Sequence, residues 1–244
     1  MADSTDPFER FSANLYLQEY YGSIGEENQF ILDFLHETYE SWKPVIVQDI
    51  GGGPTIYQLI SASRVCREIE IFEYLEENRQ AVQSWREQSS ESFNWTEYFQ
   101  AVALRENQAT VDVENRLRQK IRSVQTIDLF DPSELPHTPA SDGLPNAISS
   151  HFCVESITSD ETMFCRAWDN LTSLVRKDDY LIMSLLKNAH QYRAGSFHFP
   201  AFPVEEISLN ARLKEKGFRE ITMQTVPAEH GRDYEGIICV RAIR

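Results

Sequence analysis

The chain has 244 residues, of which 41% are hydrophobic and 25% are charged, proportions typical of a globular protein with a full core. This length fits one large domain, or one domain with an added cap. The formal net charge is −15, and the sequence contains no basic cluster that would neutralise phosphates, which argues against a nucleic-acid partner.

The first half of the chain alternates helical and strand patterns. Residues 1–12 are polar and are expected to fray. A helical stripe over 13–39 is interrupted at Gly22 and Gly25, and Pro44 ends it. The elements expected next are a strand at 45–50 that runs into three glycines, a helix at 55–63, a strand at 68–73, a helix at 76–88, an irregular aromatic segment at 89–123 with a charged helix near 113–122, and a strand at 123–129.

The second half continues the alternation and ends in two strands. The expected elements are a proline-rich loop at 131–145, a strand at 144–150, a helix at 161–174, a strand at 180–186, an aromatic insertion at 187–203, a helix at 205–216, and strands at 218–226 and 237–242. This order predicts a Rossmann-like α/β fold: a doubly wound, seven-stranded, mostly parallel sheet with an antiparallel C-terminal strand pair. We expect residues 1–43 to form an N-terminal helical cap or lid and 44–244 the main domain, with cap insertions near 89–123 and 187–203.

Cysteines and histidines show no disulfide or metal pattern. The four cysteines form no CxxC pair and lie in apolar stretches, so we expect them to be reduced. The six histidines show no HExxH or similar spacing, and no metal is expected. No signal-peptide pattern opens the chain, and no apolar run approaches the roughly 20 residues that span a bilayer. We therefore expect a cytoplasmic monomer with no membrane partner.

A glycine-rich segment, Asp49-Ile-Gly51-Gly-Gly53-Pro-Thr55, lies between a predicted strand and a predicted helix. Glycines allow a sharp turn and close approach of a ligand, although a glycine triplet alone could be a plain strand–helix turn. The next strand ends at Glu73, about 20 residues further on, where a carboxylate would meet the ribose hydroxyls of a nucleotide. A nucleotide-type ligand is therefore indicated.

The charge of this segment favours S-adenosylmethionine over NAD. A dinucleotide site needs a third glycine to cradle the diphosphate, and here Pro54 and Thr55 follow the triplet instead. Asp49 would repel a diphosphate but could attract a cationic group. S-adenosylmethionine carries a ribose and a sulfonium–ammonium tail and has no phosphate.

The sequence DIGGGPTIYQLISA at 49–62 closely resembles the motif DIGSGPTIYQLLSA, typical of the family that contains nicotinamide, phenylethanolamine and indolethylamine (thioether) N-methyltransferases. Further family motifs recur in order along residues 13–242. They are YLQEYY at 16–21 for YLxxYY, Glu73-Tyr74 with Asn78 for D-Y-x-x-x-N, Trp85 with FNW at 93–95 for W…FDW, CVE at 153–155 for C-L-[DE], and CRA at 165–167 for Y-C-R-A. The resemblance implies a class I S-adenosylmethionine-dependent methyltransferase, with 44–244 as the cofactor-binding domain.

The resemblance also implies roles for individual residues. The cofactor-binding candidates are Tyr16, Tyr21, Asp49, Gly51, Gly53, Thr55, Tyr57, Glu73, Tyr74, Asn78, Asp128, Leu129 and His151. Glu73 would take both ribose hydroxyls, in place of the commoner aspartate. Without the resemblance, only Gly51, Gly53 and Glu73 would be chosen, since the tyrosines could be packing residues and Asp128 could cap a turn.

Methyl transfer from a sulfonium is an in-line displacement, which needs alignment and desolvation but no covalent nucleophile or metal. An alkyl ammonium has a pKa of roughly 10.4, so a carboxylate that receives its proton is useful. The catalytic candidates are Glu155, where phenylethanolamine N-methyltransferases present an acid to the amine, and Asp233, near a second acid position of that subfamily, with Glu235 as a fallback. A carboxylate also stabilises the unreactive ammonium, a conflict that a relay water would ease. Glu155 could instead be a solvated residue before a helix.

The substrate side departs from the characterised subfamilies. Ser184 stands where nicotinamide enzymes carry an aspartate, and Asn188 or Ala189 where phenylethanolamine enzymes carry a glutamate, so neither a nicotinamide nor a catecholamine is supported. The substrate-binding candidates are Tyr20, Ser184, Asn188, His190, Tyr192 and Phe202. A small amine, a guanidine or a heteroaromatic nitrogen is expected as acceptor. The alternatives are methylation at sulfur, selenium or oxygen, a catalytically silent binding protein, and, more weakly, a NAD-dependent oxidoreductase.

Overall fold

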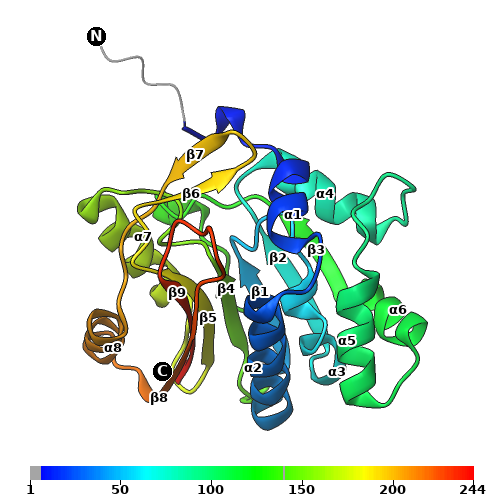
Figure 1. Ribbon diagram of the computed structural model, residues 1–244. Helices are drawn as coiled ribbons and strands as arrows, with labels where there is room; N and C mark the ends of the chain where they lie inside the picture. Colours follow the sequence, from blue (N-terminus) through cyan, green and yellow to red (C-terminus); the bar gives the residue numbers. More distant parts are fainter. Residues whose placement is uncertain (1–6, 140) are drawn as a thin grey trace.

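The computed structural model describes residues 7–139 and 141–244. Its centre is a seven-stranded sheet in the order β3-β2-β1-β4-β5-β9-β8 (Figure 1). β9 is antiparallel to both of its neighbours, and the other pairs are parallel. The strands are β1 Ile46–Ile50, β2 Glu68–Phe72, β3 Ile121–Gln125, β4 Ala147–His151, β5 Tyr180–Lys187, β8 Arg219–Pro227 and β9 Gly236–Ile243. The predicted doubly wound α/β fold is confirmed.

Helices cover both faces of this sheet, and each face has its own apolar core. One core includes side chains from α2 Glu26–Trp42, α3 Ala62–Val65, α4 Glu76–Arg86, α5 Thr96–Glu106 and α6 Thr110–Lys120. The other includes α7 Glu161–Ser173 and α8 Glu206–Glu215. The central strand β1 is buried at every position, as expected for a parallel strand covered on both sides.

A separate group of elements lies over one end of the sheet (Figure 1). It consists of the 3₁₀ turn η1 Pro7–Arg10, the helix α1 Ala13–Tyr21, and the hairpin of β6 Gln191–Ala194 with β7 Phe197–Pro200. Glu19 of α1 joins helix to hairpin, because its carboxylate accepts hydrogen bonds from Arg193 Nε at 2.8 Å and from the Gly195 N–H at 3.0 Å. Phe8 stacks on Phe199 with ring centroids 5.7 Å apart. The N-terminal segment and the hairpin thus form one cap.

The N-terminal half differs from the sequence-based expectation in two places. Residues 7–12 are not frayed but contribute η1 to the cap, and 1–6 lie outside the described residues. The predicted helix at 55–63 is instead the 3₁₀ turn η2 Tyr57–Leu59 followed by the short α3. Here the Thr55 hydroxyl donates to the Gly52 carbonyl at 2.7 Å, which holds the glycine loop in a tight turn before any helix can begin.

Element boundaries account for the remaining differences. β3 ends at Gln125, four residues before the predicted end of the strand, so residues 126–129 form a loop at the edge of the sheet. β4 begins at Ala147 and continues through His151. The irregular segment after α4 contains two helices, α5 and α6, separated at Asn107, which has a left-handed φ of 53°. The 187–203 insertion is the β6–β7 hairpin with its connections.

Candidate functional site

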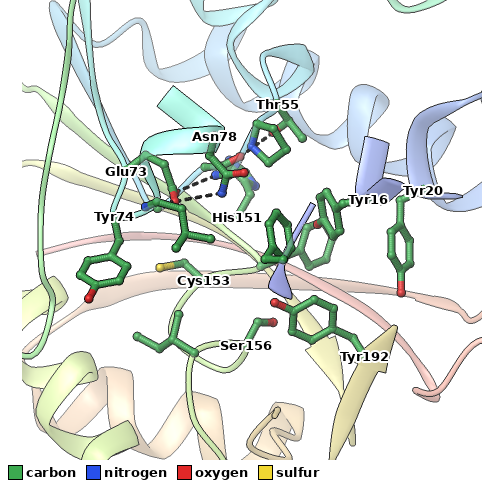
Figure 2. A pocket seen from close by; sticks show the side chains of 18 of the residues that line it. Tyr16, Tyr20, Thr55, Glu73, Tyr74, Asn78, His151, Cys153, Ser156 and Tyr192 are labelled. Atoms are coloured by element: carbon green, nitrogen blue, oxygen red, sulfur yellow. Dashed lines mark hydrogen bonds between the residues drawn. The ribbon is translucent and has the colours of Figure 1, made fainter. Parts of the chain in front are cut away.

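A cavity of about 350 Å³ opens where β1, β2 and β4 end, beneath α1 and the hairpin (Figure 2). Doubly wound folds bind ligands at this edge of the sheet. Ile50 pairs in register with Phe72, and the Gly51 N–H donates to the Phe72 carbonyl at 2.7 Å. Parallel pairing therefore places the glycine loop after β1 directly beside the residue that follows β2.

The glycine loop requires glycine for steric reasons. Gly51 and Gly53 have φ values of 66° and 64°, in the left-handed region that side chains disfavour. A Cβ on Gly51 would lie 2.1 Å from Cys153 Sγ, and one on Gly52 would lie 2.2 Å from Asp49 Oδ2. The loop is thus packed against buried side chains behind it, and its backbone faces the cavity.

Glu73 is the acid at the end of β2, and its carboxylate is held from three directions. Oε2 accepts from the Gly53 N–H at 3.0 Å, and Oε1 accepts from the Leu75 N–H at 2.9 Å and from Asn78 Nδ2 at 3.0 Å (Figure 2). Burial raises the pKa of Glu73, and these hydrogen bonds oppose that rise. Asn78 Oδ1 is buried with no hydrogen-bond partner among the described residues. Glu73 and Asn78 both line the cavity, so this part of its wall carries acceptor oxygens.

Asp49 lies behind the glycine loop and is fully buried. Its Oδ2 accepts from Gln58 Nε2 at 3.0 Å. Burial raises the pKa of Asp49 to about 7, and the hydrogen bond from Gln58 opposes that rise. The carboxylate is not among the described groups that line the cavity, so it supports the loop from beneath.

His151 lies at the end of β4 and lines the cavity with its ring held between two hydroxyls. Nε2 is 2.9 Å from Ser149 Oγ, and Nδ1 is 3.0 Å from Ser184 Oγ. Burial lowers the pKa of His151 to about 3, so the ring is neutral at physiological pH. Ser184 is fully buried beneath this ring.

The opposite wall of the cavity is aromatic (Figure 2). Tyr16 and Tyr20 of α1 have ring centroids 5.0 Å apart, and Tyr16 lies 6.4 Å from Tyr192 of the hairpin. Burial raises the pKa of Tyr20 to about 12, so its hydroxyl stays protonated. The charged residues among the described lining are all acids, namely Glu27, Glu73 and Asp128. This wall suits an aromatic or cationic ligand.

Glu155 lies immediately behind the lining and is fully buried. Its Oε1 accepts from the Leu186 N–H at 2.9 Å, while Oε2 has no hydrogen-bond partner among the described residues. Burial raises the pKa of Glu155 to about 7, and the Leu186 hydrogen bond opposes that rise. Its neighbours Ser156 and Leu186 line the cavity, so this carboxyl is one layer away from it.

Comparison with known proteins identifies the family. The profile of the NNMT/PNMT/TEMT family matches residues 1–243. The chain belongs to this family. Phenylethanolamine N-methyltransferase of Homo sapiens is 32% identical over 179 residues, which cover 72% of this chain and 64% of that protein. Nicotinamide N-methyltransferase of Homo sapiens is 31% identical over 221 residues, covering 85% of this chain and 82% of that enzyme. The chain thus spans slightly less than two thirds of the phenylethanolamine enzyme.

Solved structures share the fold at low sequence identity. Magnesium protoporphyrin IX methyltransferase from Synechocystis, solved with S-adenosylmethionine bound, has a TM-score of 0.61 at 12% identity and covers 100% of this chain and 99% of its own. The N-methyltransferase NodS from Bradyrhizobium japonicum has a TM-score of 0.51 at 13% identity, covering 89% and 94%. These structural similarities show that the chain has the class I methyltransferase fold.

Most cofactor candidates of the family motifs come together in the cavity. Those that line it are Tyr16, Tyr21, Gly51, Gly53, Thr55, Glu73, Tyr74, Asn78, Asp128, Leu129 and His151. Asp49 and Tyr57 do not. The Tyr57 ring instead packs behind Tyr21, with centroids 5.0 Å apart.

The substrate candidates divide differently. Tyr20 and Tyr192 line the cavity, whereas Ser184, Asn188, His190 and Phe202 lie elsewhere. His190 is exposed, and Phe202 stacks on Phe164 at 4.2 Å in the core of the other sheet face. Asn188 donates to Glu205 and Glu235 at the surface. These four residues are not among the described residues that line the cavity, and Ser184 contacts it only through the His151 ring. Of the hairpin residues, Tyr192 lines the cavity.

Asp233 is exposed and is likewise absent from the described lining. Its neighbour Tyr234 lines the cavity instead, together with Glu27 and Asn28 from the start of α2. Neither Glu27 nor Asn28 was selected from the sequence, since each reads as an ordinary polar residue in a first helical turn. Phe8 and Phe11 were also missed, although aromatic residues in a polar terminus are a usable signal.

Within the described residues, no group of three or more His, Cys, Asp or Glu side chains is arranged to hold a metal ion. In the same part of the chain, no helix has the length and apolar character needed to cross a membrane.

Asp49→Asn should stabilise the protein in a pH-dependent way. The pKa of Asp49 rises from 3.8 to about 7 on folding, so the folded state loses stability as pH increases through this window. At about pH 8 the free energy of unfolding should exceed that of wild type by up to about 4 kcal/mol, and the difference should vanish near pH 4. Denaturant unfolding measures it. Asp112→Asn, at an exposed position, is the control, and equal pH profiles for all three proteins would contradict the assignment.

Proposed function

We propose that this protein is an S-adenosylmethionine-dependent N-methyltransferase that acts on the nitrogen of a small amine, guanidine or heteroaromatic molecule. The observation that carries the proposal is the lining: the buried Glu73 carboxylate stands beside the Gly51–Gly53 loop, and every charged residue described in the lining is an acid. Such a lining suits a ribose and a cationic tail and disfavours a diphosphate. The names of the relatives, phenylethanolamine and nicotinamide N-methyltransferase, support transfer to nitrogen.

The residues around the cavity fit this cofactor. Glu73 accepts three hydrogen bonds out of the roughly four that a carboxylate can take, and the Asn78 Oδ1 beside it is unpaired. The Glu73 carboxylate and Asn78 Oδ1 would accept hydrogen bonds from the ribose hydroxyls. Asp128, whose Oδ1 accepts from the Phe130 N–H at 2.7 Å, would border the adenine. Tyr16, Tyr21 and Thr55 would hold the methionine portion, as the family motifs imply.

When bound, S-adenosylmethionine supplies an electrophilic methyl group on a sulfonium. The aromatic wall of Tyr16, Tyr20 and Tyr192 would exclude water and orient the acceptor nitrogen for in-line attack. Glu155, with one unpaired oxygen, would receive the proton of the nitrogen. Because its carboxyl lies one layer behind Ser156 and Leu186, the transfer would pass through the Ser156 hydroxyl or a water. A pKa of about 7 keeps Glu155 partly ionised at neutral pH, which eases the conflict between binding an ammonium and deprotonating it.

The activity is tested with isotopically labelled methyl donor and a panel of amines, guanidines and heteroaromatic bases. We expect labelled product from at least one class with a free nitrogen lone pair. Binding of S-adenosylmethionine without transfer to any nitrogen in the panel would contradict N-methylation. No binding of the cofactor by titration calorimetry would contradict the whole proposal.

Glu73→Gln should weaken cofactor binding while preserving side-chain size. Loss of hydrogen bonds to a charged group costs about 1.5–3 kcal/mol, roughly 10- to 150-fold in the dissociation constant. Titration calorimetry with S-adenosylhomocysteine measures this without any acceptor. The matched control is Glu70→Gln on the same strand, because Glu70 accepts from Gln48 at 3.0 Å and does not line the cavity. Equal affinities of wild type, Glu73→Gln and Glu70→Gln for S-adenosylhomocysteine would contradict the assignment of Glu73 to the cofactor site.

Glu155→Gln should lower turnover of the best amine by roughly 100-fold or more while cofactor affinity stays within about tenfold. A base must be ionised to act, so the wild-type kcat/KM should rise as pH passes about 7 and again as the amine itself loses its proton. The limb near 7 should disappear in the variant. Glu161→Gln, an exposed acid at the start of α7, is the control. A variant that keeps both limbs and full turnover would mean that Glu155 is only structural.

A further inference from the structure

A network of charged side chains closes the corner of the cavity where α2 begins. Glu27, in the first turn of α2, is 3% exposed and lines the cavity. Its partners come from residues 229–234, between β8 and β9, more than 200 positions further along the chain. The network therefore joins the α1–α2 turn to the β8–β9 loop.

The two ends of this network hold each other reciprocally. The Glu27 N–H donates to Glu229 Oε1 at 3.3 Å, and the Glu229 N–H donates to Glu27 Oε1 at 2.9 Å. Arg232 bridges the two carboxylates, with Nε 3.4 Å from Glu27 Oε2 and Nη2 3.3 Å from Glu229 Oε2. The Tyr234 hydroxyl donates to Glu27 Oε2 at 2.9 Å. Two carboxylates share one guanidinium, so the corner keeps an excess negative charge.

The two glutamates of this pair face different surroundings. Glu27 lines the cavity, and Glu229 is not among the described residues that do so. A carboxylate has about four acceptor sites. Glu27 accepts two hydrogen bonds, from the Glu229 N–H and the Tyr234 hydroxyl, and forms an ion pair with Arg232, which leaves at least one acceptor site for a ligand. The Arg232 guanidinium lies over the Tyr20 ring, 4.7 Å from its centroid, and is not part of the described lining. The cavity therefore meets carboxylate oxygen and tyrosine rings at this corner.

We propose that Glu27 is a specificity-determining residue, which accepts a hydrogen bond from a second polar group of the acceptor, distinct from the nitrogen that is methylated. This inference rests on the proposed function. Glu155 contacts Leu186 and is not among the described lining residues, and it is assigned to the reacting nitrogen. The preferred acceptor is thus an aromatic amine that carries a hydroxyl or ammonium at its other end. An apolar end leaves a buried acceptor unpaired, and an anionic end is repelled.

The test uses three phenethylamine probes that differ only at the para position: hydroxyl, methyl and carboxylate. Their affinities are measured by calorimetry on protein saturated with S-adenosylhomocysteine. Wild type should bind the hydroxyl probe roughly 10- to 100-fold more tightly than the methyl probe, and the carboxylate probe most weakly. In Glu27→Gln the preference for hydroxyl over methyl should fall at least about fivefold, with affinity for the methyl probe unchanged. Where turnover is measurable, the change should fall on KM and leave kcat within about twofold.

The matched control is Glu229→Gln, which alters the other carboxylate of the same network away from the cavity. If Glu27 only fastened the loop, both variants would lose selectivity equally, and that outcome would overturn the proposal. Equal affinity of wild type for the hydroxyl and methyl probes would overturn it as well. So would wild type that binds S-adenosylhomocysteine but none of the three probes. Failure to bind S-adenosylhomocysteine itself would instead count against the proposed function.

Discussion

The Glu73 carboxylate connects the separate segments from which one side of the cavity is built. It joins the glycine loop after β1 to the start of α4, through Gly53 on one oxygen and Leu75 and Asn78 on the other. The buried carboxylate requires these three donors, and without Glu73 each of the three donors would lose its hydrogen-bond acceptor. The loop conformation, the direction in which α4 leaves the sheet and the position of Asn78 therefore depend on one ionisable side chain.

The cap over the cavity depends on a different kind of interaction. Glu19 of α1 accepts hydrogen bonds from Arg193 and Gly195 of the hairpin. The Ala13 N–H at the start of α1 donates to Glu77 Oε1 of α4 at 2.9 Å. These are half-buried or exposed contacts, individually worth about 1 kcal/mol or less. The aromatic wall beneath them is held mainly by ring packing. The cap is therefore held mainly by the burial of its aromatic side chains, whereas the glycine loop is held by hydrogen bonds to Glu73.

The sequence alone was sufficient to predict which residues lie together at the cavity where that depends on the order of neighbouring elements. The strand–glycine–helix pattern and the acid one strand later are neighbours in any parallel sheet, so Gly51, Gly53 and Glu73 could be found from their order alone. Sequence reasoning failed where contacts are long-range. Glu27 acquires its position from residues more than 200 positions away, and no local pattern encodes that pairing.

A shift of one residue separates Asp233, the candidate taken from the sequence, from Tyr234, which lines the cavity. In the β8–β9 loop, Arg232 and Tyr234 turn toward Glu27, while Asp233 between them is exposed. A resemblance that is uncertain by one residue therefore reverses which side chain faces inward. The same one-residue dependence holds in the hairpin. Side chains alternate along β6, so Tyr192 is buried while its two neighbours are exposed.

In the function proposed above, two buried acids, Glu27 and Glu155, would divide the requirements of amine methylation between them. Glu27 pairs with the guanidinium that it shares with Glu229 and accepts two further hydrogen bonds, so it would receive a donor group of a ligand as an acceptor and not as a base. Glu155 has one N–H donor and an unpaired oxygen, and burial raises its pKa to about 7, so taking up a proton relieves the cost of its charge. A carboxylate that both anchored and deprotonated the same nitrogen would hold it in the unreactive ammonium form. If Glu27 anchors the acceptor and Glu155 takes its proton, as we propose, the conflict is removed, because the group that is bound and the group that reacts would belong to different ends of the acceptor.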